Sequence, residues 1–134
     1  MSTSKHGAGE ARDSHKTPRG RHVIRAKIGA GQPLGAVFRG RRPTGEVYSA
    51  ALAQAQPGRD WILTRILWLS GTQVGKNRLG NVDTMRRYIY IHGSPDEVRL
   101  GVPGSIGCIR MANRDVVRLF DWVEPGTVVN IVEE

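Results

Sequence analysis

The feature that most constrains this chain is a series of short apolar runs, each bounded by glycine, proline or asparagine. The runs are rich in β-branched and aromatic residues, which favour strands, and the first of them alternates between polar and apolar faces. Glycine and proline, with 17 and 7 copies in 134 residues, punctuate the intervals. The pattern predicts a mainly β fold, with strands expected at 21–29, 36–40, 61–70, 87–93 and 127–132.

One segment carries the periodicity of a helix instead. After the turn that holds the cysteine, Asn113 is placed to act as an N-cap and Asp115 to favour the positive helix N-terminus. Pro125 then ends the helix. Residues 1–20 and 43–60 show neither periodicity and are expected mostly as loop. The apolar stripe of the helix is formed by Val116, Leu119, Phe120 and Val123.

The length places all of these segments in one domain, residues 1–134. A chain of this size suits one hydrophobic core and is too short for two. Its single cysteine excludes an internal disulfide, which leaves the cellular compartment open. Residues 1–20 hold no apolar signal-peptide core, and the most apolar stretch, 61–71, is interrupted by Arg65. We therefore expect no membrane span and see no export signal in this chain.

Positive charge is concentrated in the first third of the chain. The formal net charge is +8, and residues 1–42 contain ten Lys and Arg against only Glu10 and Asp13. Such a basic surface attracts a polyanion, either a nucleic acid or an anionic cell-wall polymer, although it also suits an ordinary solvated surface. Only Phe38 interrupts the basic run with an aromatic ring, so stacking on single-stranded nucleic acid has little support.

The only cysteine lies in a glycine-rich turn, "GSIGCIRMAN" at residues 104–113, and His92 lies at the end of a predicted strand. Strand ends and loops are where a rigid scaffold displays reactive groups. We expect Cys108 to be a nucleophile and His92 its base and later proton donor. The backbone N–H groups of Gly107 and Cys108 are the natural candidates for an oxyanion hole.

A nucleophilic role requires the thiol to ionise. An ordinary thiol has a pKa near 8.5, and lowering it by about three units takes about 4 kcal/mol of differential stabilisation. An imidazolium at His92 would supply most of this, and Arg110 with the backbone amides of the nearby helix start would supply the rest. Two other interpretations remain open at this stage. Cys108 is a buried packing residue in one, and in the other it joins the histidines as a zinc ligand, although no paired ligand spacing supports zinc.

The segment "IHGSP" (91–95) followed by "SIGCIRMAN" (105–113) resembles the signature of the L,D-transpeptidase catalytic domain family. The segments "STSKHGAGE" (2–10) and "TPRGRHVI" (17–24) resemble the substrate-side loop and strand entry of the same family. The resemblance covers essentially the whole chain. It implies a mainly β domain, a β-sandwich-like mixed sheet with one or two short helices.

The resemblance also implies a reaction on peptidoglycan stem peptides, in cell-wall biogenesis or remodelling. Cys108 would attack the carbonyl of the third residue, a diamino acid, of a donor tetrapeptide and expel the terminal D-alanine. The thioester would pass to the amine of a second stem, to a lipoprotein lysine, or to water in a carboxypeptidase side reaction. No metal, organic cofactor or nucleic acid is implied, and the family points to the cell envelope or periplasm.

By the same resemblance, the backbone carbonyl of Gly93 would orient the His92 imidazole. Arg110 would position a substrate carboxylate or brace the loop. Ser105 and Ile106 would join it in contacting the substrate. These roles are carried over from the family motif, residue by residue.

Two departures from the family pattern bear on activity. Ile106 stands where the family has histidine, which makes the pocket drier, opposes ionisation of the thiol and predicts a slower enzyme. The family also has a strand pair ahead of residues 2–10, so we expect the natural start, with any export signal, to lie upstream. The alternative function is a catalytically impaired homologue that binds cell-wall peptides. A basic nucleic-acid-binding domain is a third possibility, which no recognised binding motif supports.

Overall fold

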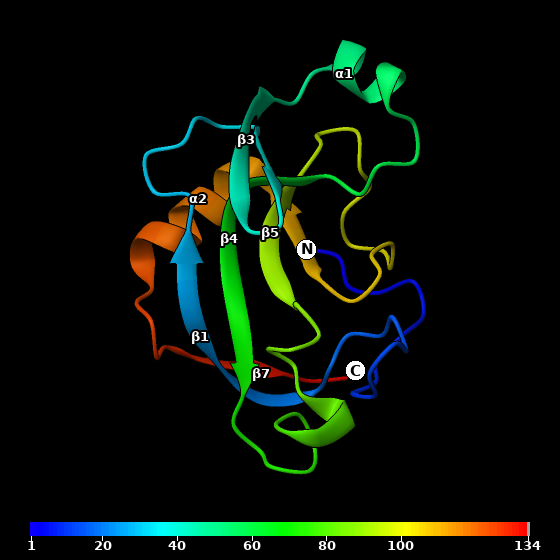
Figure 1. Cartoon of the computed structure of the whole chain (residues 1–134), viewed down its shortest axis with the longest axis vertical. Helices are drawn as coiled ribbons and strands as arrows, with labels where there is room; N and C mark the ends of the chain where they lie inside the picture. Colours follow the sequence, from blue (N-terminus) through cyan, green and yellow to red (C-terminus); the bar gives the residue numbers. More distant parts are fainter. Residues whose placement is uncertain (134) are drawn as a thin grey trace.

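The computed structural model describes residues 1–133 and is mainly β, as predicted (Figure 1). No helix in this range is both long and apolar enough to cross a membrane. The strands are β1 (Gly20–Ile28), β2 (Ala36–Arg39), β3 (Arg42–Val47), β4 (Ile62–Gly71), β5 (Tyr90–Ser94), β6 (Ile109–Ala112) and β7 (Val128–Ile131). The helices are α1 (Ala50–Ala55) and α2 (Asn113–Trp122), with a short 3₁₀ turn, η1, at Gly80–Val82.

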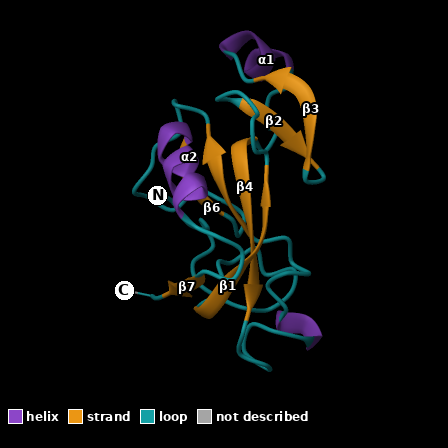
Figure 2. Cartoon of the chain, turned by 90° about the vertical axis from the view of Figure 1, so that its left-hand side faces the viewer, coloured by secondary structure: helices purple, strands orange, loops and turns teal. Residues whose placement is uncertain are grey.

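The seven strands form one sheet organised around β4. Strand order along the main path is β3-β2-β4-β1-β7, and all of these neighbours are antiparallel. Strand β5 pairs antiparallel with β4, and β6 then pairs parallel with β5. Figure 2 shows α2 against one side of the sheet, with the β2–β3 hairpin at the end opposite β7. The short parallel strand β6 ends at Ala112, and α2 begins at the next residue.

The two faces of β4 bury different clusters because successive side chains on a strand point to opposite sides. Leu67 and Leu69 are fully buried on the side covered by α2, where Val116 and Phe120 of the helix meet them. Burial of each of these leucine side chains contributes about 1.5–3 kcal/mol. On the other side, Ile66 packs in a smaller cluster with Ala36, Phe38 and Tyr90. The main hydrophobic core therefore lies between the sheet and α2, and the opposite side of the sheet, with its smaller cluster, is available for a functional site.

The structure departs from the sequence-based expectation in three places. Residues 43–60 hold most of β3 and all of α1, whose first turn is capped because Ser49 Oγ accepts from the Leu52 N–H. The expectation of loop there was wrong. The strand β6 was not foreseen. The N-cap of α2 is Ala112 and not Asn113, because the Asn113 side chain binds the Thr64 hydroxyl at 2.6 Å.

Candidate active site

The parallel pairing of β5 with β6 brings the cysteine and histidine segments together. In the register of these strands, Ile91 lies beside Ile109 and His92 beside Arg110. The two isoleucines belong to the core under α2, so alternation directs His92 and Arg110 to the opposite side of the sheet. Cys108, just before β6, packs against the cluster on that opposite side. The nucleophile and base expected from the sequence thus share one face.

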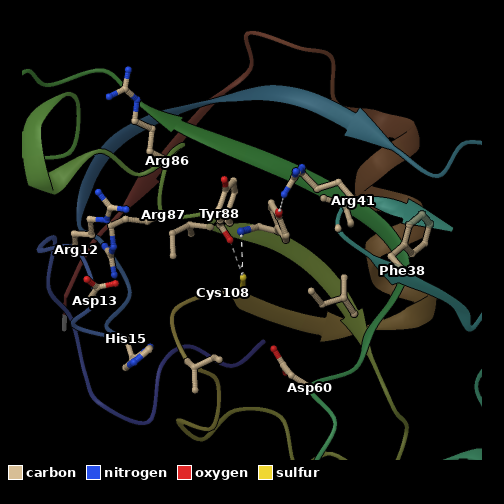
Figure 3. A pocket seen from close by; sticks show the side chains of 16 residues that line it. Arg12, Asp13, His15, Phe38, Arg41, Asp60, Arg86, Arg87, Tyr88 and Cys108 are labelled. Carbon is tan, nitrogen blue, oxygen red and sulfur yellow. Dashed lines mark hydrogen bonds between the residues drawn. The ribbon is translucent and has the colours of Figure 1, made fainter. Parts of the chain in front are cut away.

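The Cys108 thiol lies among backbone groups of the strand next to it. Its Sγ accepts the Tyr90 N–H at 3.3 Å and its S–H donates to the Tyr88 carbonyl at 3.5 Å (Figure 3). Burial raises the pKa of Cys108 to about 12, although the Tyr90 N–H and the charges of Arg110 and Arg87 lower it in part. This direction is opposite to the expected lowering. The desolvation of the thiolate outweighs the nearby positive charge, and the thiol is protonated at neutral pH.

The His92 imidazole is fixed in one tautomer. The residue is 1% exposed, and its Nδ1 lies 2.6 Å from the carbonyl oxygen of Gly93. A carbonyl only accepts, so Nδ1 carries the hydrogen and Nε2 offers a lone pair. Burial lowers the pKa of His92, while the hydrogen bond to Gly93 and the charge of Asp60 raise it in part. The resting pair is therefore a neutral imidazole and a neutral thiol.

Gly93 holds this geometry because no side chain fits at its position. A Cβ there would overlap Asn113 Oδ1 at the start of α2 and the carbonyl oxygen of Leu63 in β4. The pairing of β4 with β5 shifts register between Leu63 and Ile66, and Thr64 adopts a positive φ of 74° at this irregularity. The Thr64 hydroxyl then donates to Asn113. The carbonyl that holds His92 is thus anchored by β4 and α2 together.

The turn before Cys108 uses its polar groups internally. Ser105 is 2% exposed, and its hydroxyl donates to the Cys108 carbonyl and accepts the Gly107 N–H at 3.3 Å. The Gly107 carbonyl accepts from the Thr17 hydroxyl at 3.0 Å. Ser105 therefore braces the turn, and the substrate contact expected of it does not fit this burial. The Gly107 N–H is thus already engaged, which leaves the Cys108 N–H as the better candidate of the two predicted oxyanion donors.

Arg110 also makes internal contacts. Its Nη1 donates to the Gly104 carbonyl at 3.0 Å, and its Nη2 lies 3.2 Å from Asp60 Oδ1. These two bonds tie the cysteine loop to the segment that enters β4. Of the two roles that the family resemblance offered, the contacts fit bracing of the loop. Asp60 was not anticipated from the sequence.

Cys108 opens into a cavity of about 460 Å³, a size that suits a small-molecule or peptide side-chain ligand (Figure 3). Ile106 is 48% exposed and lines this cavity, and its contact with substrate stays a prediction. The walls come from the N-terminal loop, the β2–β3 hairpin, β4 with its entry, the start of β5 with the segment before it, and the turn that holds Cys108. They are Arg12, Asp13, His15, Phe38, Gly40, Arg41, Asp60, Ile62, Ile66, Arg86, Arg87, Tyr88, Ile89, Tyr90, Ile106 and Cys108.

Arg87 attaches the N-terminal loop to this cavity. Its guanidinium donates to the carbonyls of Gly9 at 3.2 Å and Lys16 at 2.6 Å and to the Ser14 hydroxyl at 3.3 Å. Burial lowers the pKa of Arg87. Sequence reasoning missed Arg87, Arg41 and Asp60 because their partners lie far away along the chain and no local motif marks them. Within residues 1–133, no three His, Cys, Asp or Glu side chains gather as metal ligands.

Fold and site together define a class of protein: a mainly β domain with a thiol and an imidazole on one face of two adjacent parallel strands, beside an arginine-lined cavity. The family model of the L,D-transpeptidase catalytic domain (YkuD) matches residues 2–131, and the chain belongs to this family. The family comprises acyltransferases that act on peptidoglycan in the cell envelope.

One solved structure, an L,D-transpeptidase from Mycobacterium smegmatis, is similar over 93% of this chain, with 18% sequence identity and a TM-score of 0.46. The match covers 46% of that protein, so this chain spans about half of its length. No curated protein matches the chain.

Proposed function

We propose that this chain is an L,D-transpeptidase that acts on peptidoglycan stem peptides through a thioester on Cys108. The observation that carries the proposal is the fixed imidazole on the thiol's side of the sheet. His92 Nδ1–H is held by the Gly93 carbonyl at 2.6 Å, which leaves Nε2 as the only ring position able to take a proton. A neutral base on the same face of the sheet as a neutral thiol is suited to general-base activation.

In the first half-reaction, Sγ attacks the scissile carbonyl of the donor tetrapeptide while its proton passes to His92 Nε2. The Cys108 N–H donates to the oxyanion that forms on the carbonyl oxygen. The C–N bond then breaks, and His92 returns the proton to the departing amine of D-alanine. The products are free D-alanine, a thioester on Cys108 and a neutral imidazole.

In the second half-reaction, an acceptor amine attacks the thioester and gives a proton to His92 Nε2. The C–S bond breaks, and the proton passes from His92 to the leaving sulfur, which restores the thiol. A stem-peptide amine gives a cross-link, a lipoprotein lysine gives an attached protein, and water gives carboxypeptidase activity. The proposed place of action is the cell envelope, in cell-wall biogenesis or remodelling.

A second candidate function is a catalytically impaired homologue that binds cell-wall peptides. The observation that favours it is the raised pKa of Cys108, about 12, in a cavity where Ile106 supplies an apolar wall. We favour a slow enzyme over an inactive one. The proposed base, carbonyl anchor and oxyanion donor are all present, and none of them is supplied by the side chain at position 106.

The test is incubation of the purified chain with a disaccharide tetrapeptide, with and without a second stem as acceptor. Intact-mass measurement should find an adduct on Cys108 equal to the donor minus D-alanine, and chromatography should find released D-alanine. Cys108→Ser and His92→Gln should each abolish both signals while retaining the fold by circular dichroism. Peptide binding without adduct or D-alanine release would favour the impaired homologue over the enzyme.

A further inference from the structure

The cavity beside Cys108 carries an excess of positive charge that the proposed proton transfers do not use. Its walls include Arg12, Arg41, Arg86 and Arg87 against two carboxylates, Asp13 and Asp60. Asp60 is already paired with an arginine of the cysteine loop. A cavity with this balance attracts an anionic group of a ligand.

Arg41 is the arginine best prepared to bind such a group. It follows Gly40 in the tight turn between β2 and β3, with a positive φ of 64°. Its guanidinium lies over two aromatic rings, 5.1 Å from the centroid of Trp68 and 4.8 Å from that of Tyr88. Its Nη1 donates to the Tyr90 hydroxyl at 3.1 Å. Three aromatic side chains therefore hold the planar head in one orientation.

The partners of Arg41 are aromatic, and among residues 1–133 no carboxylate forms an ion pair with it. Arg87, in contrast, is committed to carbonyls of the N-terminal loop. Arg41 is a partly buried residue, and its oriented guanidinium, with N–H donors to spare, matches the two oxygens of a carboxylate. Its neighbour Arg42 is exposed and does not line the cavity.

Tyr90 connects this guanidinium to the nucleophile. Its hydroxyl accepts from Arg41 and its backbone N–H donates to Cys108 Sγ. Figure 3 shows Arg41 beside Tyr88 on one side of Cys108, with Asp60 on the other side. Because Tyr90 contacts both groups, a ligand whose reacting carbonyl meets the sulfur can place a carboxylate against Arg41 at the other end of this tyrosine.

We propose that Arg41 is a specificity residue that binds a carboxylate of the donor stem peptide and aligns its scissile carbonyl with Cys108. This inference rests on the proposed transpeptidase function. In a donor whose third residue is diaminopimelate, two carboxylates flank the scissile carbonyl: the one on the side chain of that residue and the C-terminal one of D-alanine. Amidation of the carboxylate that binds Arg41 removes its charge and one acceptor oxygen, so the amidated peptide is a poorer donor.

The experiment measures peptide binding by calorimetry in the full chain carrying Cys108→Ala, so that no turnover is needed. The ligands are the tetrapeptide with free carboxylates, the same peptide amidated on the third-residue side chain, and the same peptide amidated at its C-terminus. Arg41→Met is added to the Cys108→Ala background and compared with Arg42→Met, which removes one charge from the same hairpin. Circular dichroism checks the fold of each variant.

Arg41→Met should weaken binding of the free peptide about tenfold or more, the loss of one charge-assisted hydrogen-bonded pair, while Arg42→Met changes it less than about twofold. The Arg41 effect should vanish for one of the two amidated peptides, which identifies the carboxylate. If Arg41→Met does not fold, Tyr90→Phe, which removes the orienting hydroxyl, should show a smaller weakening with the same dependence on amidation.

An Arg41 effect that is absent, or that persists for both amidated peptides, overturns the inference. The outcome is separable from that of the proposed function. Failure of the wild-type chain to release D-alanine would contradict the proposed transpeptidase activity. The dependence of peptide binding on Arg41 is measured separately, in the Cys108→Ala background. Turnover by an Arg41→Met variant with unchanged KM likewise contradicts the specificity role and leaves the enzyme intact.

Discussion

The pKa of about 12 for Cys108 makes a quantitative prediction about thiol reactivity in the ligand-free protein. At pH 7.5, a thiol of pKa about 8.5 is roughly 10% ionised, whereas one of pKa about 12 is ionised to about 3 parts in 10⁵. A more basic thiolate is also more nucleophilic, with a Brønsted slope of about 0.4–0.5, which recovers about one and a half powers of ten. Alkylation of folded Cys108 should therefore be on the order of 100-fold slower than that of an ordinary cysteine.

The assay is iodoacetamide labelling followed by intact mass between pH 6 and 10, with the urea-unfolded chain as the reference. The single cysteine makes the readout unambiguous. The folded rate should rise about tenfold per pH unit over the whole range without levelling, because only the thiolate reacts and its pKa lies above the range. The unfolded rate should level near pH 9. A folded rate that levels at or below pH 7 would refute the neutral pair and restore a resting thiolate–imidazolium pair.

The remaining predictions concern His92, Gly93 and His22. Burial lowers the pKa of His92 and raises that of Cys108 to about 12. The value of kcat/KM should therefore rise with pH through an inflection below pH 6.5 and then stay flat to pH 9. A bell-shaped profile centred near neutrality would contradict the assignment of a neutral thiol and a neutral imidazole. Gly93→Ala should lower the free energy of unfolding, measured in urea, by about 2 kcal/mol or more and should also lower kcat, because the added Cβ would overlap atoms of β4 and α2. The control is Gly104→Ala, whose added Cβ would meet only an ordinary contact, so its free energy of unfolding should change little. His22 is fully buried, and burial lowers its pKa, so below pH 6.5 the unfolded chain binds a proton that the folded chain does not bind, and the free energy of unfolding falls as pH falls. His22→Gln should make thermal unfolding between pH 7 and 4 less dependent on pH. An unchanged pH dependence of the melting temperature would contradict this prediction.

The strands that could be predicted from the sequence are those long enough or apolar enough to show a recognisable pattern. Strand β4 was predicted at 61–70 and lies at Ile62–Gly71, and β1, β2 and β7 were found with similar accuracy, whereas β5 begins at Tyr90, three residues after its predicted start. Strand β6 was not predicted because it has only four residues, leads directly into a helix and shows no alternation of its own. The segment Arg42–Val47 contains proline and glycine, which weaken a strand pattern, and its pairing with β2 decides its structure.

The site divides in the same way. Cys108, His92 and Gly93 could be singled out because they fall in a local motif, and the structure places the Gly93 carbonyl on His92 Nδ1. The charge state of the pair could not be foreseen, since it depends on burial by segments distant in sequence. Ser105 illustrates the limit well. Its motif position suggested a substrate contact, but a side chain buried under the N-terminal loop has its hydroxyl satisfied inside the turn.

The neutral pair and the arginine-lined cavity constrain one another. An anionic peptide bound beside Cys108 raises the pKa of the thiol further, since like charge disfavours the thiolate. Substrate binding therefore cannot prepare the nucleophile by ionising it, and the proton has to leave as the carbon–sulfur bond forms. The acceptor that we propose for this proton is His92 Nε2, whose availability depends on the hydrogen bond from Nδ1 to the Gly93 carbonyl. In the proposed mechanism, the rate therefore depends on how well Gly93 fixes the imidazole and how well the cavity positions the scissile carbonyl.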